Sequence, residues 1–501
     1  MTATLGDLLR PLERPDVAID PGVLTSSAAD APVTGVAYDS RAVRAGAVFV
    51  ALKGQRADGA EFARSAIEQG AVAVVAESAP GNEVPVPWLR VRDARLALAL
   101  LADAFYGHPS GELAVVGTTG TNGKTTTTYL LRALFEAAGV KSGIVGTVAN
   151  AIGDDERQSD RTTPEAPDLQ AMLREMVDRG CGACPLEVSS HALALRRVDG
   201  TRFAAAVFTN LTREHLDYHG SMAEYFAAKR RLFEMLSSEA PAAINMDDPH
   251  GEALREVVSR PVTYAIDQPA DVTPGPLSFS MEGLRFEVRT PRGLLHIRSK
   301  LIGRPNVYNL LAAATAATAL DLPFSAIEKG VSALEGVPGR FQVVSGPSDD
   351  VVTIVDYAHS DDALRSLLET LRPLASGRLI TVFGCGGDRD RSKRPLMGAV
   401  AARLSDLVII TSDNPRGEDP MRILEDIKRG LTPAATEYLV LVDREAAIDK
   451  AVELARPADM VLVAGKGHEK YQAIGERVLP FDDVVVVREA LARRRAKLRV
   501  C

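Results

Sequence analysis

The chain has 501 residues, of which 46% are hydrophobic and 25% charged, a balance that excludes disordered and fibrous proteins. Its 58 Lys and Arg against 66 Asp and Glu give a net charge of −8, and aromatic residues make up only 5%. Nucleic acid is therefore not the expected ligand, because basic patches and stacking platforms are not suggested. At roughly 100–200 residues per domain, the length indicates about three domains.

The first residues lack the basic start and apolar stretch of a signal peptide. The longest apolar runs, residues 96–102 and 310–320, are far shorter than the ~20 residues that span a bilayer. Cys181 and Cys184 have zinc-ligand spacing, but no second pair follows, so small packing residues are favoured over a metal or redox site. We expect a cytoplasmic protein without membrane insertion, and a monomer.

The chain order of apolar runs and turn residues predicts an α/β protein. Residues 35–54 alternate apolar and polar positions, and residues 62–78 indicate a helix, a glycine cap and a buried strand. Residues 108–111, His-Pro-Ser-Gly, have the composition of a linker. We therefore assign residues 1–108 to a small N-terminal α/β domain.

A second domain is predicted over residues 109–339. A short strand at 112–117 leads through a Gly- and Thr-rich turn into a helix that ends at Gly139. Further strand-like runs, separated by helical patterns, indicate a mainly parallel sheet; they lie at 184–190, 204–210 and 240–246.

A third domain, residues 340–501, is predicted to be Rossmann-like. Its apolar runs end in Gly, Asp or Asn and alternate with helical stretches, as in a doubly wound sheet; they lie at 351–358, 379–387, 407–415 and 460–467. In such sheets the ligand site is at the carboxyl ends of the strands.

The turn at residues 117–126, Gly-Thr-Thr-Gly-Thr-Asn-Gly-Lys-Thr-Thr, predicts a nucleotide site. Its glycines let backbone N–H groups surround phosphate oxygens at a helix N-terminus. Lys124 would reach the terminal phosphates, and Thr125 or Thr126 would place a hydroxyl on Mg²⁺. The strict phosphate-loop pattern is not met, because Thr118 stands at its first glycine position. The loop alone does not distinguish a kinase, a motor, a switch or a ligase.

Further motifs resemble, in order and spacing, those of the Mur ligases, the ATP-dependent enzymes that build the peptidoglycan stem peptide. They are GTNGKTT at 120–126, TTPE at 162–165, LEVSSHAL at 186–193, TNLTREHLDYHG at 209–220, YFAAKRRLF at 225–233, GRPNVYNLLAA at 303–313, GVPGRFQ at 336–342, VDYAHS at 355–360, FGCGGDRDRSKRPLMG at 383–398, SDNPRGEDP at 412–420 and GKGHEKYQ at 465–472. The similarity spans nearly the whole chain and is greatest to enzymes that add the third amino acid.

The resemblance implies a reaction in which a carboxylate of UDP-N-acetylmuramoyl-L-alanyl-D-glutamate takes the γ-phosphoryl group of ATP. The amino group of meso-2,6-diaminopimelate then attacks this acyl phosphate, giving an amide, ADP and phosphate. Two alternatives stay open: an L-lysine-adding ligase of the same family, and a P-loop NTPase switch that binds wall precursors. The three domains would bind the UDP-sugar, ATP and the amino acid, in that order.

The resemblance also implies the catalytic residues, which are Lys124, Glu187, His215 and Lys229. Two Mg²⁺ ions are expected, with Thr125, Glu187, His215 and a carbamylated Lys229 as ligands. Taken in isolation, Lys229 would be a solvated helix lysine. Carbamylation requires a neutral amine, hence burial or cationic neighbours that lower its pKa.

Binding residues follow from the same resemblance. For ATP they are Gly120, Thr121, Asn122, Gly123, Lys124, Thr125, Thr126, Asn309, Arg340 and Asp356, with His359 close to the nucleotide. For the UDP-muramoyl dipeptide they are Tyr38, Ser40, Gln55, Arg56, Thr162, Thr163, Ser189 and Arg197. Ser189 could equally cap the helix that follows it.

The residues implied to bind diaminopimelate are Arg389, Asp413, Asn414, Pro415, Arg416, Gly465 and Glu469. The sequence Asp-Asn-Pro-Arg at 413–416 could be an ordinary turn. However, diaminopimelate ends in a second amino-acid head, whose carboxylate suits a planar arginine such as Arg416. Lysine ends in a bare ammonium, which Arg416 would repel. Asp413 and Glu469 can accept hydrogen bonds from the distal ammonium.

Overall fold

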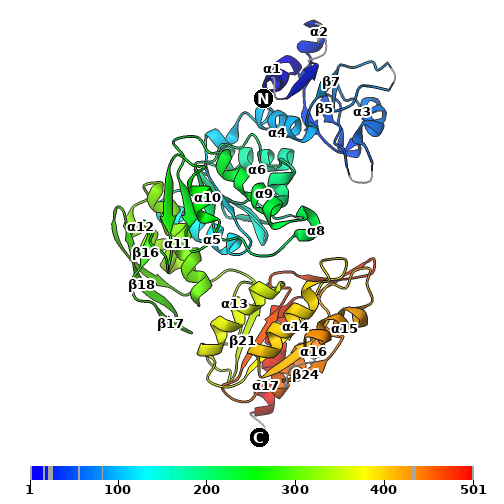
Figure 1. Cartoon of the computed structure of the whole chain (residues 1–501). Coiled ribbons are helices and arrows are strands. Elements are labelled where there is room, and N and C mark those ends of the chain that lie inside the picture. Colours follow the sequence, from blue (N-terminus) through cyan, green and yellow to red (C-terminus); the bar gives the residue numbers. More distant parts are fainter. Residues whose placement is uncertain are drawn as a thin grey trace.

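The computed structural model describes residues 3–14, 17–20, 26–54, 57–81, 83–159, 161–431 and 436–498. Three α/β units follow one another in chain order, with the N-terminal unit at one end and the C-terminal unit at the other (Figure 1). The predicted mixed α/β fold class is confirmed. Within the described ranges, no helix has both the length and the apolar character to cross a membrane.

The N-terminal unit is a five-stranded sheet with helices on both faces. Its strands, in sheet order, are β2 (Ala18–Asp20), β7 (Trp88–Val91), β6 (Ala73–Ala76), β5 (Ala47–Val50) and β4 (Gly35–Ala37). Helices α1 (Leu5–Leu9) and α4 (Ala94–Phe105) share one apolar core with the sheet, and α3 (Ala63–Glu68) shares the other. A short helix, α2 (Ser26–Ala29), and the pair β1 (Ala3–Thr4) and β3 (Pro32–Val33) complete the unit.

The central unit is built on an eight-stranded sheet, parallel except at the edge formed by β10 and β11. Its order is β11 (Asp155–Gln158), β10 (Ala149–Ile152), β9 (Ile144–Val145), β12 (Ala183–Glu187), β8 (Ala114–Thr119), β13 (Ala205–Phe208), β14 (Ala242–Asn245) and β15 (Pro261–Tyr264). The strands predicted at 112–117, 184–190, 204–210 and 240–246 are confirmed as β8, β12, β13 and β14.

Two layers of helices cover this sheet. On one face, α5 (Lys124–Ala137), α11 (Arg304–Ala319) and α12 (Phe324–Ala333) share a core. On the other face lie α6 (Ala166–Asp178), α7 (Ser190–Ala194) and α9 (Met222–Glu234). Two short helices, α8 (Leu216–His219) and α10 (Gly251–Arg255), connect strands to these layers. The phosphate loop and the end of β12 therefore meet at the carboxyl edge of neighbouring parallel strands.

A four-stranded antiparallel sheet extends the first of these cores, and Figure 1 shows it beside α11 and α12. Its strands are β16 (Thr273–Pro274), β17 (Ser278–Ser280), β18 (Gly283–Thr290) and β19 (Gly293–Ser299). Alternate residues of β18 are buried and exposed, as expected for a strand with one solvated face.

The C-terminal unit contains a six-stranded sheet in which only β20 is antiparallel. Its order is β20 (Gln342–Val343), β21 (Val352–Asp356), β25 (Met460–Ala464), β22 (Leu379–Phe383), β23 (Leu407–Ile410) and β24 (Glu437–Val440). Helices α13 (Asp361–Leu371), α14 (Lys393–Leu404) and α15 (Pro420–Leu431) cover one face, and α16 (Arg444–Leu454) and α17 (Asp483–Leu498) cover the other. A hairpin of β26 (Tyr471–Ile474) and β27 (Arg477–Pro480) lies outside the sheet.

Polar contacts join the units. Between the N-terminal and central units, the Tyr38 hydroxyl donates to the Asp168 carboxylate at 3.0 Å. Between the central and C-terminal units, Nη2 of Arg213 donates to the Ser392 hydroxyl at 2.9 Å. These contacts tie both outer units to the central one.

Candidate active site

The phosphate loop connects β8 to α5, as predicted. Gly120 and Gly123 have φ angles of 151° and 89°, which disfavour residues with a side chain. A Cβ at Gly120 would lie 1.9 Å from Oγ1 of Thr209, and one at Gly123 would lie 2.4 Å from Oδ1 of Asn309. Both glycines are therefore required for the loop to pass this close to its neighbours.

Lys124, the first residue of α5, folds back over this loop. Its Nζ donates to the carbonyl oxygens of Gly120 and Thr121, both at 2.9 Å. Burial lowers the pKa of Lys124, against the opposing effect of Glu187 and Glu214. The ammonium is thus held at the mouth of the loop, where a terminal phosphate would offer it charged acceptors in place of carbonyls.

Glu187, at the end of β12, is 1% exposed and accepts three hydrogen bonds. Its carboxylate receives the Thr125 hydroxyl at 3.0 Å, the Thr147 N–H at 2.8 Å and the Thr147 hydroxyl at 3.0 Å. Thr125 and Glu187 thereby bring two hard oxygen donors together, the ligand type that Mg²⁺ prefers. Thr147 was missed by the sequence reasoning, because nothing in its local pattern distinguishes it.

Lys229 lies on the buried face of α9 and is 1% exposed. Its Nζ donates to the Gly120 carbonyl oxygen at 2.7 Å and lies 4.5 Å from the centre of the Tyr225 ring. Burial and the neighbouring Lys124 ammonium hold the pKa of Lys229 well below its ordinary value. The interpretation of Lys229 as a solvated helix lysine is therefore wrong, since tertiary packing covers this face of the helix.

His215 precedes α8 with a left-handed backbone, φ 55°. Burial lowers its pKa to about 4, despite the adjacent Glu214 carboxylate. The His191 ring lies 4.9 Å from it, centre to centre. His215 is therefore a neutral imidazole near pH 7, the form that can bind a metal.

Glu214 is a site residue that sequence reasoning missed, although it directly precedes His215 in the TREHLDYH motif. Oε1 of Glu214 lies 3.2 Å from Nε2 of His359 in the C-terminal unit. Burial raises the pKa of Glu214, but the hydrogen bond to His359, together with the charges of His359, His215 and Lys124, holds the pKa below its ordinary value.

Among the expected nucleotide contacts, Arg340 reaches from the C-terminal unit to the phosphate loop. Its Nη2 donates to the Thr125 hydroxyl at 3.2 Å, and its guanidinium lies 4.4 Å from the Tyr357 ring centre. The Asp356 carboxylate accepts from the N–H groups of Phe341 and Ala358, and burial raises its pKa. Asn309 lies against Gly123.

Four of the residues expected to bind the UDP-muramoyl dipeptide are grouped around Glu187; they are Thr162, Thr163, Ser189 and Arg197. The Thr163 hydroxyl donates to the Glu187 carbonyl oxygen at 2.8 Å, and the Thr162 hydroxyl lies 2.9 Å from that of Thr147. Ser189 caps α7 by accepting from the Ala192 N–H. Nη2 of Arg197 pairs with Glu165 at 2.8 Å.

The other four residues expected to bind the UDP-muramoyl dipeptide are Tyr38, Ser40, Gln55 and Arg56. Tyr38 bonds to Asp168, and burial raises the pKa of Tyr38 to about 12. Ser40 begins a short helical turn over Ser40–Ala42. Gln55 and Arg56 lie outside the described residues.

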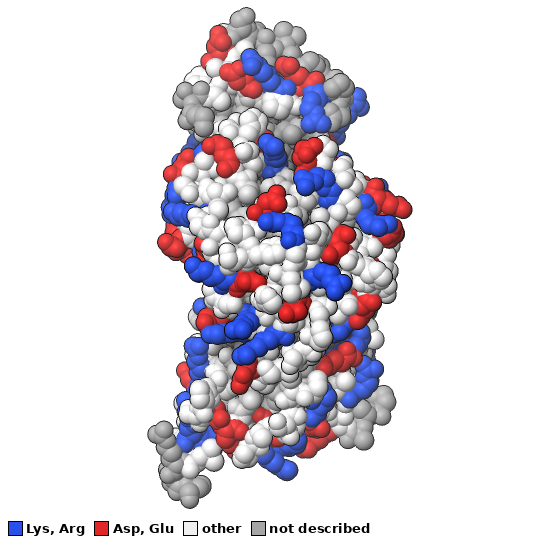
Figure 2. All heavy atoms as spheres, turned by 90° about the vertical axis from the view of Figure 1, so that its left-hand side faces the viewer, with Lys and Arg blue, Asp and Glu red and all other residues white. Residues whose placement is uncertain are grey.

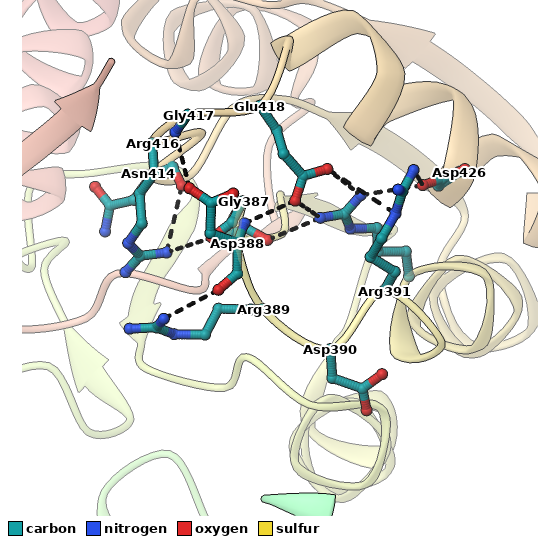
Figure 3. A network of polar contacts seen from close by, with 12 residues as sticks. Gly387, Asp388, Arg389, Asp390, Arg391, Asn414, Arg416, Gly417, Glu418 and Asp426 are labelled. Carbon is teal, nitrogen blue, oxygen red and sulfur yellow. Dashed lines mark hydrogen bonds and ion pairs between the residues drawn. The ribbon is translucent and has the colours of Figure 1, made fainter. Parts of the chain in front are cut away.

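The expected diaminopimelate site is formed by loops at the strand ends of the C-terminal unit (Figure 3). The Asn414 side chain donates to Glu469 at 2.8 Å and accepts from Nζ of Lys466 at 3.0 Å. A Cβ at Gly465 would lie 2.7 Å from Oδ2 of Asp413, so the backbone must approach closely there. Pro415 precedes Arg416, whose Nη1 donates to the Gly387 carbonyl oxygen at 2.9 Å.

Arg389 is exposed and borders a cavity of about 460 Å³ next to these loops. Basic and acidic side chains are interspersed over the face shown in Figure 2. The cationic groups of the site are instead placed individually, at the phosphate loop and at the strand ends.

Comparisons with known proteins agree with this arrangement. Three family models match: the Mur ligase family catalytic domain at residues 32–106, the Mur ligase middle domain at 118–317 and the Mur ligase glutamate ligase domain at 339–467. A UDP-N-acetylmuramoyl-L-alanyl-D-glutamate--2,6-diaminopimelate ligase of Gloeobacter violaceus is 47% identical over 477 residues, covering 95% of this chain and 97% of the relative.

Solved structures give the same result. A UDP-N-acetylmuramoyl-L-alanyl-D-glutamate--2,6-diaminopimelate ligase superposes with a TM-score of 0.71 and 35% identity, covering 99% of each chain. The MurF ligase of Thermotoga maritima in complex with ADP, at 19% identity and a TM-score of 0.63, covers 93% of this chain and 98% of its own and shares the fold. On its motifs, its three-unit fold and these similarities, the chain belongs to the Mur ligase family.

Proposed function

We propose that this chain is an ATP-dependent ligase that adds meso-2,6-diaminopimelate to UDP-N-acetylmuramoyl-L-alanyl-D-glutamate in peptidoglycan synthesis. Curated relatives that align with this chain over nearly their whole length are named UDP-N-acetylmuramoyl-L-alanyl-D-glutamate--2,6-diaminopimelate ligases. The observation that carries the proposal is the hydrogen bond from Arg340 to Thr125, which links the C-terminal unit that holds Arg416 to the phosphate loop. An acyl phosphate made at the loop must meet an amine held by the other unit.

The first step is phosphoryl transfer from ATP to a carboxylate of the dipeptide. The loop N–H groups and Lys124 would hold the terminal phosphates and stabilise the charge that develops between two anions. Arg340, already bonded to Thr125, would add a second cation on the side of the C-terminal unit. Thr162, Thr163, Ser189 and Arg197 would hold the dipeptide next to Glu187.

In the second step, the neutral amine of diaminopimelate attacks the acyl carbon, and phosphate leaves as the amide forms. Arg416 and Arg389 would bind the carboxylates of the incoming amino acid, and Asp413 and Glu469 its distal ammonium. Asn414 is fixed between Glu469 and Lys466 and so orients this loop.

Thr125, Glu187, His215 and a carbamylated Lys229 are the residues proposed to hold Mg²⁺. The paired oxygens of Thr125 and Glu187, and the buried amine of Lys229 with its lowered pKa, fit this role. Bound Mg²⁺ supplies positive charge that stabilises the phosphoryl oxygens. ATP is the proposed co-substrate.

The domain assignment remains a proposal: residues 1–108 bind the UDP-sugar, 109–339 bind ATP and 340–501 bind the amino acid. We further propose that the protein is cytoplasmic and monomeric. Its ligands are proposed to be small molecules, with no nucleic acid among them.

One assay tests the function: purified protein, Mg-ATP, the UDP-muramoyl dipeptide, and either meso-diaminopimelate or L-lysine. ADP release and an amide product that depend on diaminopimelate are expected. Product with lysine alone would favour the sibling ligase. Phosphate release that needs no amino acid and yields no amide would favour the NTPase switch.

A further inference from the structure

Two loops of the C-terminal unit face each other through residues with left-handed backbones. Asp388, after β22, has φ 52°, and Arg416, after β23, has φ 50°. This conformation is unfavourable for a side chain such as arginine, while aspartate tolerates it better. Contacts from the surroundings must therefore hold Arg416 in place.

The two loops brace each other through hydrogen bonds (Figure 3). The Gly417 N–H donates to Oδ2 of Asp388 at 2.9 Å, and the Asp388 N–H donates to Oε1 of Glu418 at 2.7 Å. A carboxylate of each loop thus accepts a hydrogen bond from the backbone of the other loop. Gly417 and Glu418, which make these bonds, directly follow Arg416. The Arg416 guanidinium itself donates to the Gly387 carbonyl oxygen.

Glu418 forms an ion pair with Arg394 of α14. The Arg394 side chain is 0% exposed, and its two terminal nitrogens donate to the two Glu418 oxygens at 2.8 and 3.0 Å. Nη1 of Arg394 also donates to Asp426 at 3.0 Å. The bond from Arg394 lowers the pKa of Glu418 to about 2, so the carboxylate is charged near pH 7.

The β26–β27 hairpin holds the opposite side of Arg416. The Arg416 N–H donates to the Ala473 carbonyl oxygen at 3.0 Å, and the Arg416 carbonyl oxygen accepts from Gly475 at 2.7 Å. The hairpin thus fixes the Arg416 backbone. The direction of the Arg416 side chain then depends on the loop that follows it, and Asp388 and Glu418 hold that loop in place.

We propose that Glu418, together with Asp388 and the buried Arg394, forms a clamp that positions Arg416 and sets the selectivity for diaminopimelate over lysine. This inference rests on the proposed function. Asp388, Arg394 and Glu418 are positioning residues, because they act through Arg416. An arginine distinguishes diaminopimelate from lysine only when its guanidinium is directed at the second carboxylate. A loosened loop should therefore weaken binding of the second amino-acid head group before it slows amide formation.

The test compares Glu418→Gln and Asp388→Ala with the wild type in the amide assay, using meso-diaminopimelate and L-lysine. Both variants should raise KM for diaminopimelate about tenfold or more, as expected for a broken charge-assisted network, with kcat and KM for ATP within about twofold. Preference for diaminopimelate over lysine, as a ratio of kcat/KM values, should fall by a similar factor.

Two matched variants serve as controls. Asp388→Asn keeps an oxygen acceptor and tolerates the left-handed backbone, so it should keep KM within about threefold. Glu425→Gln changes an exposed acid of α15, the helix that follows Glu418, and lies outside the clamp, so it should behave as wild type.

Unchanged KM for diaminopimelate in both Glu418→Gln and Asp388→Ala would overturn the clamp while leaving the proposed function intact. An equal fall in kcat/KM for every substrate, in proportion to a lowered Tm, would also overturn the clamp, because a purely structural role would give that result. No diaminopimelate-dependent amide from the wild type would overturn the proposed function and the clamp with it.

Discussion

Lys124 and Lys229 donate to the same oxygen, the carbonyl of Gly120, at 2.9 and 2.7 Å. One lies at the start of α5 and the other on α9, and both have a lowered pKa, with burial the largest cause. Two ammonium groups this close destabilise each other in a buried site. The arrangement therefore favours a neutral Lys229 amine, the state that reacts with CO₂.

Replacing Lys229 by methionine should separate its chemical role from its structural one. Activity should fall by at least about 100-fold, because a required anionic ligand is lost. Tm should not fall, since methionine fills similar space in place of a buried amine, and the Gly120 carbonyl oxygen keeps its hydrogen bond from Lys124. Diaminopimelate-dependent ADP release and thermal denaturation measure the two quantities. Arg230→Gln, at the exposed neighbour, should leave both unchanged. Retained activity in Lys229→Met would contradict the carbamate proposal.

The lowered pKa of Lys229 also predicts how stability depends on pH. Between the folded-state pKa and the usual value of about 10.4, the unfolded chain binds more protons than the folded chain. Stability contributed by Lys229 should therefore rise with pH across that window. Free energies of unfolding from urea titrations in CO₂-free buffer, compared between wild type and Lys229→Met, should converge as pH rises from 7 toward 10. A constant difference would refute the shift.

Glu187 can be tested with two substitutions. Glu187→Gln keeps the shape and an acceptor for Thr125 or Thr147, so stability should change little, whereas activity and Mg²⁺-dependent nucleotide binding should be lost. Glu187→Ala leaves buried donors without a partner and should destabilise the fold by about 1–3 kcal/mol. Calorimetric titration of ADP with and without Mg²⁺ measures the binding. Equal Mg²⁺ dependence in Glu187→Gln and wild type would exclude Glu187 as a ligand.

The contact between Glu214 and His359 should help to hold the C-terminal unit against the central one. Glu214→Gln weakens this contact and should increase the radius of gyration measured by small-angle X-ray scattering. His359→Gln should have a similar effect, and the double variant should be no more open than either single one, since both act through one contact. Glu234→Gln, on the exposed surface of α9, is the matched control. Fully additive effects would show that the two residues act separately.

Local patterns in the sequence determined much of the fold. The apolar run at 112–117, the glycine-rich turn and the helix ending at Gly139 are found as β8, the phosphate loop and α5. Ser189 caps its helix as its position suggested. Such features depend on residues near one another in the chain, so one sequence reveals them. The motif set, read as a resemblance, identified the family that the comparisons show.

What the sequence by itself determined was therefore the order of strands and helices, the phosphate loop and the family. Only the tertiary structure decided that Lys229 is buried, that Thr147 donates to Glu187, that Glu214 pairs with His359 and that the buried Arg394 pairs with Glu418. The physical reason is that burial and pairing depend on segments distant in the chain, which fix the pKa of a lysine or the direction of an arginine. A charged residue in a helical pattern is expected to face solvent, unless it is known which segment packs over that face of the helix.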